Sequence, residues 1–191
     1  MARPREFDTD VAVTQAMHLF REHGYRATSM PRLTARLGIG SGSLYAAFDS
    51  KDGLYARALE RYCDGLVAAL RRDIQNGPDI RTALYGLLIT MVDADAADPE
   101  RSCLLISATT ERSAHEGTTE QVRTAMEKVE TVLTSALHAA RDRGEIRDDH
   151  CPEELARFLT TFIQGLRVMG RARAGREFLE SAVAGALRAL D

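Results

Sequence analysis

The stretch that decides the fold is residues 28–48, which read TSMPRLTARLGIGSGSLYAAF. Thr28 or Ser29 offers an N-cap for a helix, and Pro31 follows where the first turn tolerates a missing N–H. Gly38 can adopt the positive φ that ends such a helix, and a second short helix follows at once. Two short helices joined by a tight turn with glycine form a helix-turn-helix, and we predict that motif here.

The second helix of the pair is predicted to begin at Gly40 or Ser41 and to end near Phe48. Leu44 and Phe48 can both pack inward from one face, and Ile39 fills the crevice between the helices. Small residues let a helix enter the major groove of DNA, and hydroxyls can reach base edges or phosphates. The outward face is of this kind and carries Ser41, Gly42, Ser43, Tyr45 and Ala46.

Helical periodicity of apolar residues continues along the rest of the chain, and strand signals are nearly absent. A first stripe begins after a cap at Asp8 or Thr9 and stops at Gly24. We predict an all-α protein of about nine helices on this pattern. Its N-terminal three-helix domain is predicted at residues 1–52 and a C-terminal helical domain at residues 53–191.

The composition excludes several classes of protein. Among 191 residues the net charge is −3, divided as +1 over residues 1–52 and −4 over 53–191, so charge alone does not identify DNA binding. No apolar run reaches the roughly 18 residues that span a bilayer, and the N-terminus lacks the apolar core of a secretion signal. We therefore expect a cytoplasmic protein with no membrane partner.

Catalytic and cofactor motifs are missing from the sequence. There is no nucleophile elbow, no HExxH and no glycine-rich phosphate loop, so an enzyme is disfavoured and no cofactor is expected. The three cysteines, Cys63, Cys103 and Cys151, are widely spaced and form no CxxC or Cys/His cluster. We expect reduced thiols and no metal site.

A family resemblance rests on several short motifs. They are Gly24-Tyr25-x-Ala27-Thr28-Ser29, Leu37-Gly38-Ile39, Gly42-Ser43-Leu44-Tyr45, Phe48, and Ser50-Lys51-x-x-Leu54. Together they resemble the DNA-binding domain of tetracycline-repressor-like (TetR) regulators over residues 8–60. The resemblance implies a repressor that binds a palindromic operator in double-stranded DNA as a homodimer. It also implies a C-terminal domain that dimerises and binds a small-molecule effector, which releases the DNA.

The resemblance also implies which residues touch DNA. The helix over 41–48 would be the recognition helix, with an N-terminal arm and two helix starts adding contacts to the backbone. The implied DNA-binding residues are Arg3, Arg5, Thr28, Ser29, Arg32, Ser41, Gly42, Ser43, Tyr45, Ala46 and Lys51. The recognition helix has no Arg, Lys, Asn or Gln, so readout would lean on apolar contacts, the arm and DNA shape.

The C-terminal domain is predicted to hold an effector pocket and a dimer interface. The implied pocket residues are Leu84, Leu88, Met91, Cys103, Ile106, Thr109, Thr110, Met126, Val129 and Phe158. The last two helices would pack on their symmetry mates through Phe162, Gly165, Leu166, Ala182, Ala186 and Leu187. The competing interpretation of both sets is that periodic apolar residues form the protein's own core.

An alternative function concerns Cys103. The segment Arg101-Ser102-Cys103-Leu104-Leu105 resembles a segment of those TetR-like regulators whose cysteine responds to oxidants or electrophiles. A thiol near a helix N-terminus and an arginine can have a lowered pKa. A free cysteine is nonetheless usually a small buried hydrophobe, so both interpretations stay open.

Overall fold

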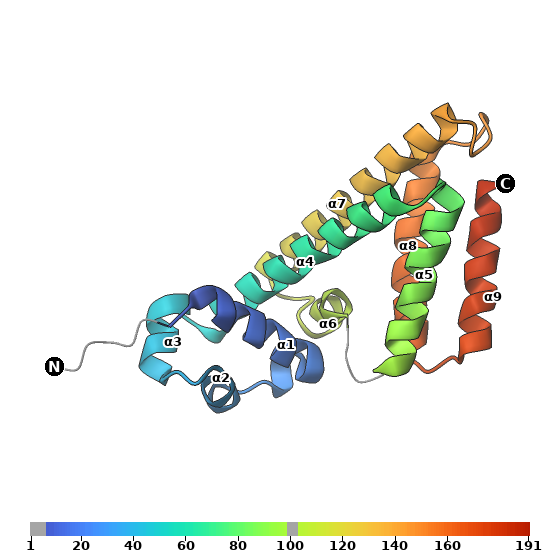
Figure 1. The fold of residues 1–191 in the computed structure, drawn as a ribbon. Coiled ribbons are helices and arrows are strands. Elements are labelled where there is room, and N and C mark those ends of the chain that lie inside the picture. Colours follow the sequence, from blue (N-terminus) through green and yellow to red (C-terminus); the bar gives the residue numbers. More distant parts are fainter. Residues whose placement is uncertain (1–6, 99–102) are drawn as a thin grey trace. The chain divides into compact units, whose positions relative to one another are not determined.

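The computed structural model describes residues 7–98 and 103–191, which form α-helices and no strand (Figure 1). The prediction of an all-α chain with about nine helices is confirmed. In the described ranges the helices are α1 (Thr9–Ala27), α2 (Met30–Leu37), α3 (Ser41–Phe48), α4 (Lys51–Asn76), α5 (Ile80–Ala97), α6 (Leu104–Glu111), α7 (Glu116–Asp142), α8 (Pro152–Arg171) and α9 (Arg176–Leu187), followed by a short 3-10 helix (Arg188–Leu190).

The chain divides into two compact units, which do not coincide with the two predicted domains. The first unit comprises residues 1–64 and 102–122, and the second comprises residues 65–101 and 123–191. The predicted boundary at residues 52 and 53 falls inside α4, and α6 belongs with the N-terminal helices. Sequence pattern could not show this, because the grouping depends on packing between distant segments.

The first unit is built around aromatic and aliphatic side chains of α1 to α4. Phe20 and Tyr55 are both almost completely buried, and their rings meet edge to face at 4.9 Å. Leu33, Leu44 and Phe48 are buried as the sequence predicted, which anchors α2 and α3 to α1. This core fixes the helix-turn-helix and leaves the opposite side of α3 to solvent.

Local signals set the helix ends in this unit. Asp8 caps α1 by accepting the N–H groups of Asp10 and Val11. Gly24 has φ 77° and ψ 175°, a conformation essentially restricted to glycine, and it breaks the helix that resumes up to Ala27. Gly38 ends α2 in the left-handed region at φ 65°, as predicted.

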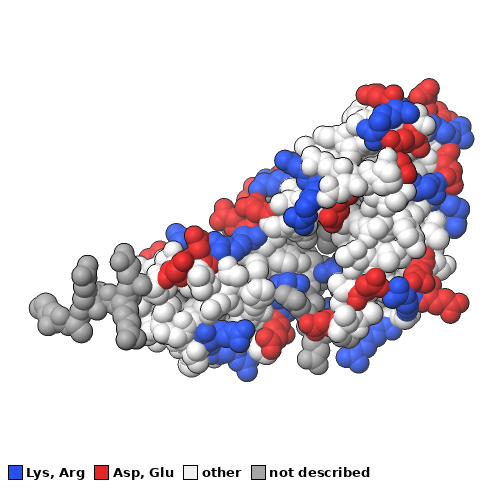
Figure 2. All heavy atoms as spheres, in the orientation of Figure 1, with Lys and Arg blue, Asp and Glu red and all other residues white. Residues whose placement is uncertain are grey.

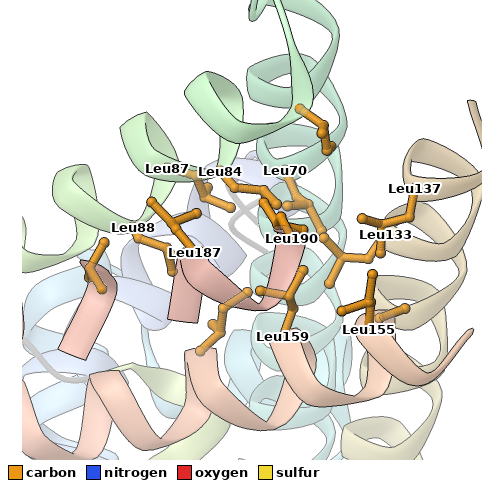
Figure 3. Close-up of a cluster of buried hydrophobic side chains, with 14 of the residues drawn as sticks. Leu70, Leu84, Leu87, Leu88, Leu133, Leu137, Leu155, Leu159, Leu187 and Leu190 are labelled. Atoms are coloured by element: carbon orange, nitrogen blue, oxygen red, sulfur yellow. The ribbon is translucent and has the colours of Figure 1, made fainter. Parts of the chain in front are cut away.

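The second unit has a core of aliphatic side chains. Helices α5, α8 and α9 run side by side, and parts of α4 and α7 add to the same cluster (Figure 1). The buried members of the cluster are all Leu, Ile, Val or Ala. Figure 3 shows its leucines pointing toward one another from several helices: Leu70, Leu84, Leu87, Leu88, Leu133, Leu137, Leu155, Leu159, Leu187 and Leu190.

The surface carries charges of both signs. On the face drawn in Figure 2, Lys and Arg side chains alternate with Asp and Glu rather than gathering in one basic patch. This matches the small net charge of −3. Within the described part of the chain, no helix is long and apolar enough to cross a membrane.

Candidate nucleic-acid interface

The helix-turn-helix is formed by α2, a tight turn and α3. The N–H of Gly38 bonds back to the carbonyl of Thr34, and the N–H of Ile39 bonds to the same carbonyl at 3.3 Å. Ile39, in the turn, is half-buried. The turn therefore satisfies the Thr34 carbonyl in the last turn of α2 and leads into α3 without a long loop.

The outward face of α3 is open. Ser41, Gly42, Tyr45 and Ala46 are exposed, and Ser43 is half-buried. Tyr45 keeps 49% of its surface accessible, so its ring and hydroxyl project from an otherwise small-residue face. A helix with this outline can approach a groove closely, and Tyr45 is the longest side chain that it presents.

The start of α2 departs from the prediction at one residue. Ser29 caps the helix by accepting the N–H of Arg32 at 3.3 Å, and Arg32 is exposed. Thr28 is fully buried, and its hydroxyl donates to the carbonyl of Gly24 at 2.6 Å. Because the break at Gly24 leaves that carbonyl without its helical partner, the Thr28 hydroxyl is used internally and not presented to a phosphate.

The start of α4 carries the predicted phosphate ligand Lys51 in an aromatic setting. Its ammonium lies 4.0 Å from the centre of the Tyr25 ring, a cation–π distance. Partial burial lowers the pKa of Lys51, against the opposing effect of the neighbouring Asp52. Lys51 remains half-exposed, so its charge is held on a rigid support next to α3.

A polar cluster that sequence analysis missed surrounds the same tyrosine. The Arg112 side chain is only 7% exposed, and its guanidinium lies 3.8 Å from the centre of the Tyr25 ring. It donates to Asp52 at 2.5 Å and, through Nε, to the Thr118 hydroxyl at 3.1 Å. The Tyr25 hydroxyl donates to the same Asp52 carboxylate at 2.8 Å. The segment after α6 is thereby fixed to the start of α4.

The electrostatics of this cluster favour a charged Asp52 and a neutral Tyr25. Burial acts to raise the pKa of Asp52, but the hydrogen bonds from Tyr25 and Arg112 together outweigh it, and the pKa lies below the ordinary value. Burial, followed by the hydrogen bond to Asp52, raises the pKa of Tyr25. Tyr25 therefore stays protonated as a donor, and Asp52 stays an anion matched by Arg112.

A second contact from the same segment holds the break in α1. Glu111 accepts the backbone N–H of Arg26 at 3.0 Å. A Cβ added to Gly24 would stand 2.3 Å from a carboxylate oxygen of Glu111. No sequence signal pointed to these contacts, because they join residues 60 to 85 positions apart. The two remaining predicted DNA-binding residues, Arg3 and Arg5, lie outside the described residues.

The predicted effector-pocket residues are divided between the two units. Cys103, Ile106, Thr109 and Thr110 belong to the first unit, and the other six belong to the second. The aliphatic core of the second unit contains Leu84, Leu88 and Val129. Their periodicity therefore fits the competing interpretation, in which such residues form the protein's own core. The other predicted pocket residues of the second unit are half-buried, as Met91 and Met126 are, or exposed, as Phe158 is.

A cleft of about 570 Å³ does open in the second unit, at a different place. It lies between the end of α4, the turn into α5 and one side of α7, and Pro78, Val132 and Ser135 line it. The predicted pocket residues are absent from its described lining. The sequence therefore did not identify this cleft.

The predicted dimer residues on α8 and α9 fall into two groups. Leu166, Ala186 and Leu187 are buried within the unit's own core, because they lie on the inward faces of their helices. Phe162 and Ala182 are half-buried and Gly165 is exposed. The structure adds an apolar stripe along α8, in which Phe162 is half-buried and Phe158, Gly165, Val168 and Met169 are exposed.

None of the three cysteines, all within the described residues, is in a disulfide. Cys103 is 8% exposed, and the Tyr62 hydroxyl lies 3.4 Å from its sulfur. Cys151 is exposed, and its thiol donates to Glu153 at 3.2 Å. Over residues 7–98 and 103–191, no group of His, Cys, Asp and Glu side chains could hold a metal ion.

Comparisons with known proteins match both parts of the chain. Residues 13–58 match the family described as bacterial regulatory proteins, tetR family, and residues 81–186 match the tetracyclin repressor-like C-terminal domain. The HTH-type transcriptional repressor ComR of Escherichia coli (strain K12) is 34% identical over 183 residues, covering 93% of this chain and 86% of that protein. The uncharacterized HTH-type transcriptional regulator YezE of Bacillus subtilis (strain 168) is 29% identical, with both chains covered completely.

A solved structure extends the match to a DNA complex. It is a cysteine mutant of the TetR family transcriptional regulator CifR complexed with 26bp double-strand operator DNA. The TM-score is 0.86 and the sequence identity 32%, with 100% of each chain covered. The likeness therefore includes both the helix-turn-helix and the C-terminal helices.

Proposed function

This chain belongs to the tetR family of bacterial regulatory proteins and is a DNA-binding transcriptional regulator, not an enzyme; on that premise we propose that it is a repressor. The family resemblance predicted from residues 24–54 is confirmed. We further propose that it binds a palindromic operator as a homodimer and is released by a small-molecule effector. The cytoplasm, where the operator DNA lies, is its proposed location.

The observation that carries the proposal is the open face of α3. Tyr45, 49% exposed on a small-residue helix whose other side is sealed by Leu44 and Phe48, suits insertion into the major groove. We assign base or backbone contacts to the exposed and half-exposed residues of this region and leave out the buried Thr28 side chain. The proposed contacts are Ser29, Arg32, Ser41, Gly42, Ser43, Tyr45, Ala46 and Lys51, with Arg3 and Arg5 as further predictions.

A mobility-shift assay against the DNA upstream of the protein's own gene tests this function. A repressor should give a shifted band that weakens with rising salt, because phosphate contacts release counterions. A scrambled duplex of equal length is the control and should compete poorly. The absence of any salt-sensitive shift, with upstream DNA or with other palindromes, would contradict the proposal.

The dimer proposal is supported by the stripe along α8. Phe158 and Phe162 stack with ring centres 6.0 Å apart, and Phe158 is 42%, Val168 47% and Met169 38% exposed. An apolar stripe of this length on one helix is typical of an interface between copies. Two copies would also present two recognition helices about 34 Å apart, one turn of DNA. Phe178 and Ala182 of α9 extend the proposed surface.

The oligomeric state tests this part by sedimentation. Phe158→Glu places a charge in the stripe and should convert dimer to monomer, with a large loss of operator affinity. Tyr85→Glu is the matched control, because Tyr85 is a 52% exposed aromatic residue on α5 outside the stripe. A Phe158→Glu protein that sediments like the wild type would rule out this interface.

The effector proposal rests on the family and on two half-buried methionines of the second unit, Met91, which packs against the core, and Met126. Flexible thioethers beside aliphatic side chains suit a mainly apolar ligand. A thermal-shift screen of small molecules tests it. Molecules that raise the melting temperature should also lower operator affinity, since release requires different affinities for the two states. Stabilising molecules that leave operator binding unchanged would argue against release.

A second candidate function, thiol sensing through Cys103, is favoured by one contact. The Tyr62 hydroxyl, 3.4 Å from the sulfur, is a donor that would stabilise a thiolate. If the thiol is the sensor, an oxidant or electrophile should release the wild type from DNA but not Cys103→Ser. Equal release of both proteins would eliminate this alternative.

A further inference from the structure

The start of α4 presents an electrostatic problem for DNA binding. Lys51, the proposed phosphate ligand, is followed directly by Asp52, whose side chain is 51% exposed. An uncompensated carboxylate beside a phosphate-binding lysine would repel the phosphate and compete for the lysine. The Asp52 carboxylate therefore needs a cationic partner that does not itself bind DNA.

Arg112 supplies that cation from a distant part of the chain. Its side chain is 7% exposed, so solvent screens it little, and it donates directly to the Asp52 carboxylate. The Thr118 hydroxyl holds the guanidinium by accepting from Nε at 3.1 Å. A guanidinium is also charged at every physiological pH, so the compensation is permanent.

The Tyr25 ring fixes the geometry of the two cations. The Arg112 guanidinium lies 3.8 Å and the Lys51 ammonium 4.0 Å from the centre of the ring. The hydroxyl of the same ring donates to Asp52 at 2.8 Å. Arg112, Asp52 and Lys51 are therefore arranged around one rigid aromatic group. If the Arg112 charge is lost, Lys51 is left as the cation on which the Asp52 carboxylate acts.

We propose that Arg112 is a positioning residue for DNA binding, which neutralises Asp52 and so keeps Lys51 available to a DNA phosphate. The inference rests on the proposed function, in which Lys51 touches the DNA backbone. Arg112 itself is buried and makes no DNA contact in this account. Its effect on affinity arises from the charge that it cancels.

The test is a rescue experiment with a fluorescent duplex DNA of arbitrary sequence, because phosphate contacts act on any sequence. Anisotropy titrations of the full chain over a range of salt compare Arg112→Met, Asp52→Asn and the double variant. Arg112→Met should weaken binding about three- to tenfold, the range expected for losing one phosphate contact per protomer. Adding Asp52→Asn should restore most of the affinity, since the exposed carboxylate is then gone.

Lys51→Met should reduce the salt slope by about one per protomer, and Arg112→Met should cost little in that background. Arg61→Met is the matched control, because Arg61 also ties α4 to a distant residue, donating to the Thr14 hydroxyl at 2.7 Å. It should leave affinity and slope unchanged in folded protein.

A purely structural Arg112 would give a different result. The melting temperature of Arg112→Met would then fall while the DNA affinity of the folded protein stayed at the wild-type value, or the double variant would bind as weakly as Arg112→Met alone. Either result overturns the proposal. If Arg112→Met does not fold, Arg112→Gln, which keeps donors but loses the charge, carries the same expectation. A wild type that binds no duplex would instead contradict the proposed function.

Discussion

The interiors of the two units of this protein differ in their chemistry. In the second unit the buried cluster consists of Leu, Ile, Val and Ala side chains. In the first unit the core is partly aromatic, and it contains all of the buried polar side chains found over the described residues: Thr28, Ser107, Arg112 and Thr118. The unit that presents the proposed DNA-binding face is thus the one with buried polar side chains.

The two kinds of core fix side-chain geometry to different degrees. An aliphatic core tolerates exchange among side chains of similar volume, because its attraction is not directional. A buried network of hydrogen bonds and a stacked guanidinium fixes distances and angles, and every member must be satisfied. We interpret the polar interior as the means of fixing α3 and the start of α4 for contact with a rigid duplex.

The largest effect on stability is expected in the aliphatic core. Leu133 is completely buried, so Leu133→Ala should lower the free energy of unfolding by about 2–5 kcal/mol through lost burial and a cavity. Urea unfolding followed by circular dichroism measures it. Thr131→Ala, at an exposed position of the same helix, is the control. A loss below about 1 kcal/mol for Leu133→Ala would show that the cluster can collapse around the gap.

A smaller effect is expected in the polar network. Thr118 is 3% exposed, and Thr118→Val keeps the side-chain shape while removing the acceptor for Arg112 Nε. Leaving a buried donor without a partner costs about 1–3 kcal/mol, which denaturant unfolding can resolve. The control is the exposed neighbour Thr119, whose hydroxyl donates to the carbonyls of Ser113 and His115 at 3.2 Å. Thr119→Val should cost less than Thr118→Val, because water can replace these exposed hydrogen bonds. Equal losses of stability in the two variants would mean that the network does not depend on the Thr118 hydroxyl.

The smallest effect is expected from Glu153, on the surface of the second unit, which should make the stability of the folded chain depend on pH in acid. The hydrogen bond with His138, followed by a backbone N–H and the Cys151 thiol, lowers the pKa of Glu153 to about 2 from an ordinary 4.5. A carboxyl whose pKa is lower in the folded chain stabilises it fully above its unfolded pKa, and that stabilisation disappears as the pH falls toward 2.

Melting temperatures at several pH values between about 5 and 2 test this, because the range covers the ordinary pKa of a glutamate and the lowered pKa of Glu153. Glu153→Gln should show a shallower decline with acid than the wild type. Glu154→Gln, an exposed neighbour that lacks those hydrogen bonds, is the control. Identical declines for wild type and Glu153→Gln would contradict the assignment.

The same contrast explains what could be predicted from the sequence. Periodicity and caps identified the helices and the helix-turn-helix, because Ser29, Gly38 and the spacing of Leu44 and Phe48 act within a few residues. They also showed that Leu84 and Leu88 are apolar positions on one face, but not whether that face meets a ligand or the core. The structure puts both in the core.

The polar network could not be predicted in this way. Arg112 and Asp52 are 60 residues apart, and neither belongs to a periodic pattern. Thr28 matched the expected motif for a phosphate contact, yet the glycine break four residues earlier turned its hydroxyl inward. Contacts that depend on which distant segments meet need the folded chain.

One titration tests whether the open face of α3 reads DNA. The wild type and Tyr45→Ala are titrated by anisotropy against the DNA upstream of the gene, at fixed salt, with melting temperatures measured alongside. Because Tyr45 is exposed and contributes little to the core, Tyr45→Ala should melt like the wild type but bind at least about tenfold more weakly, the value of one good base or backbone contact. Unchanged affinity in a normally folded Tyr45→Ala protein would show that Tyr45 on α3 does not contact the operator.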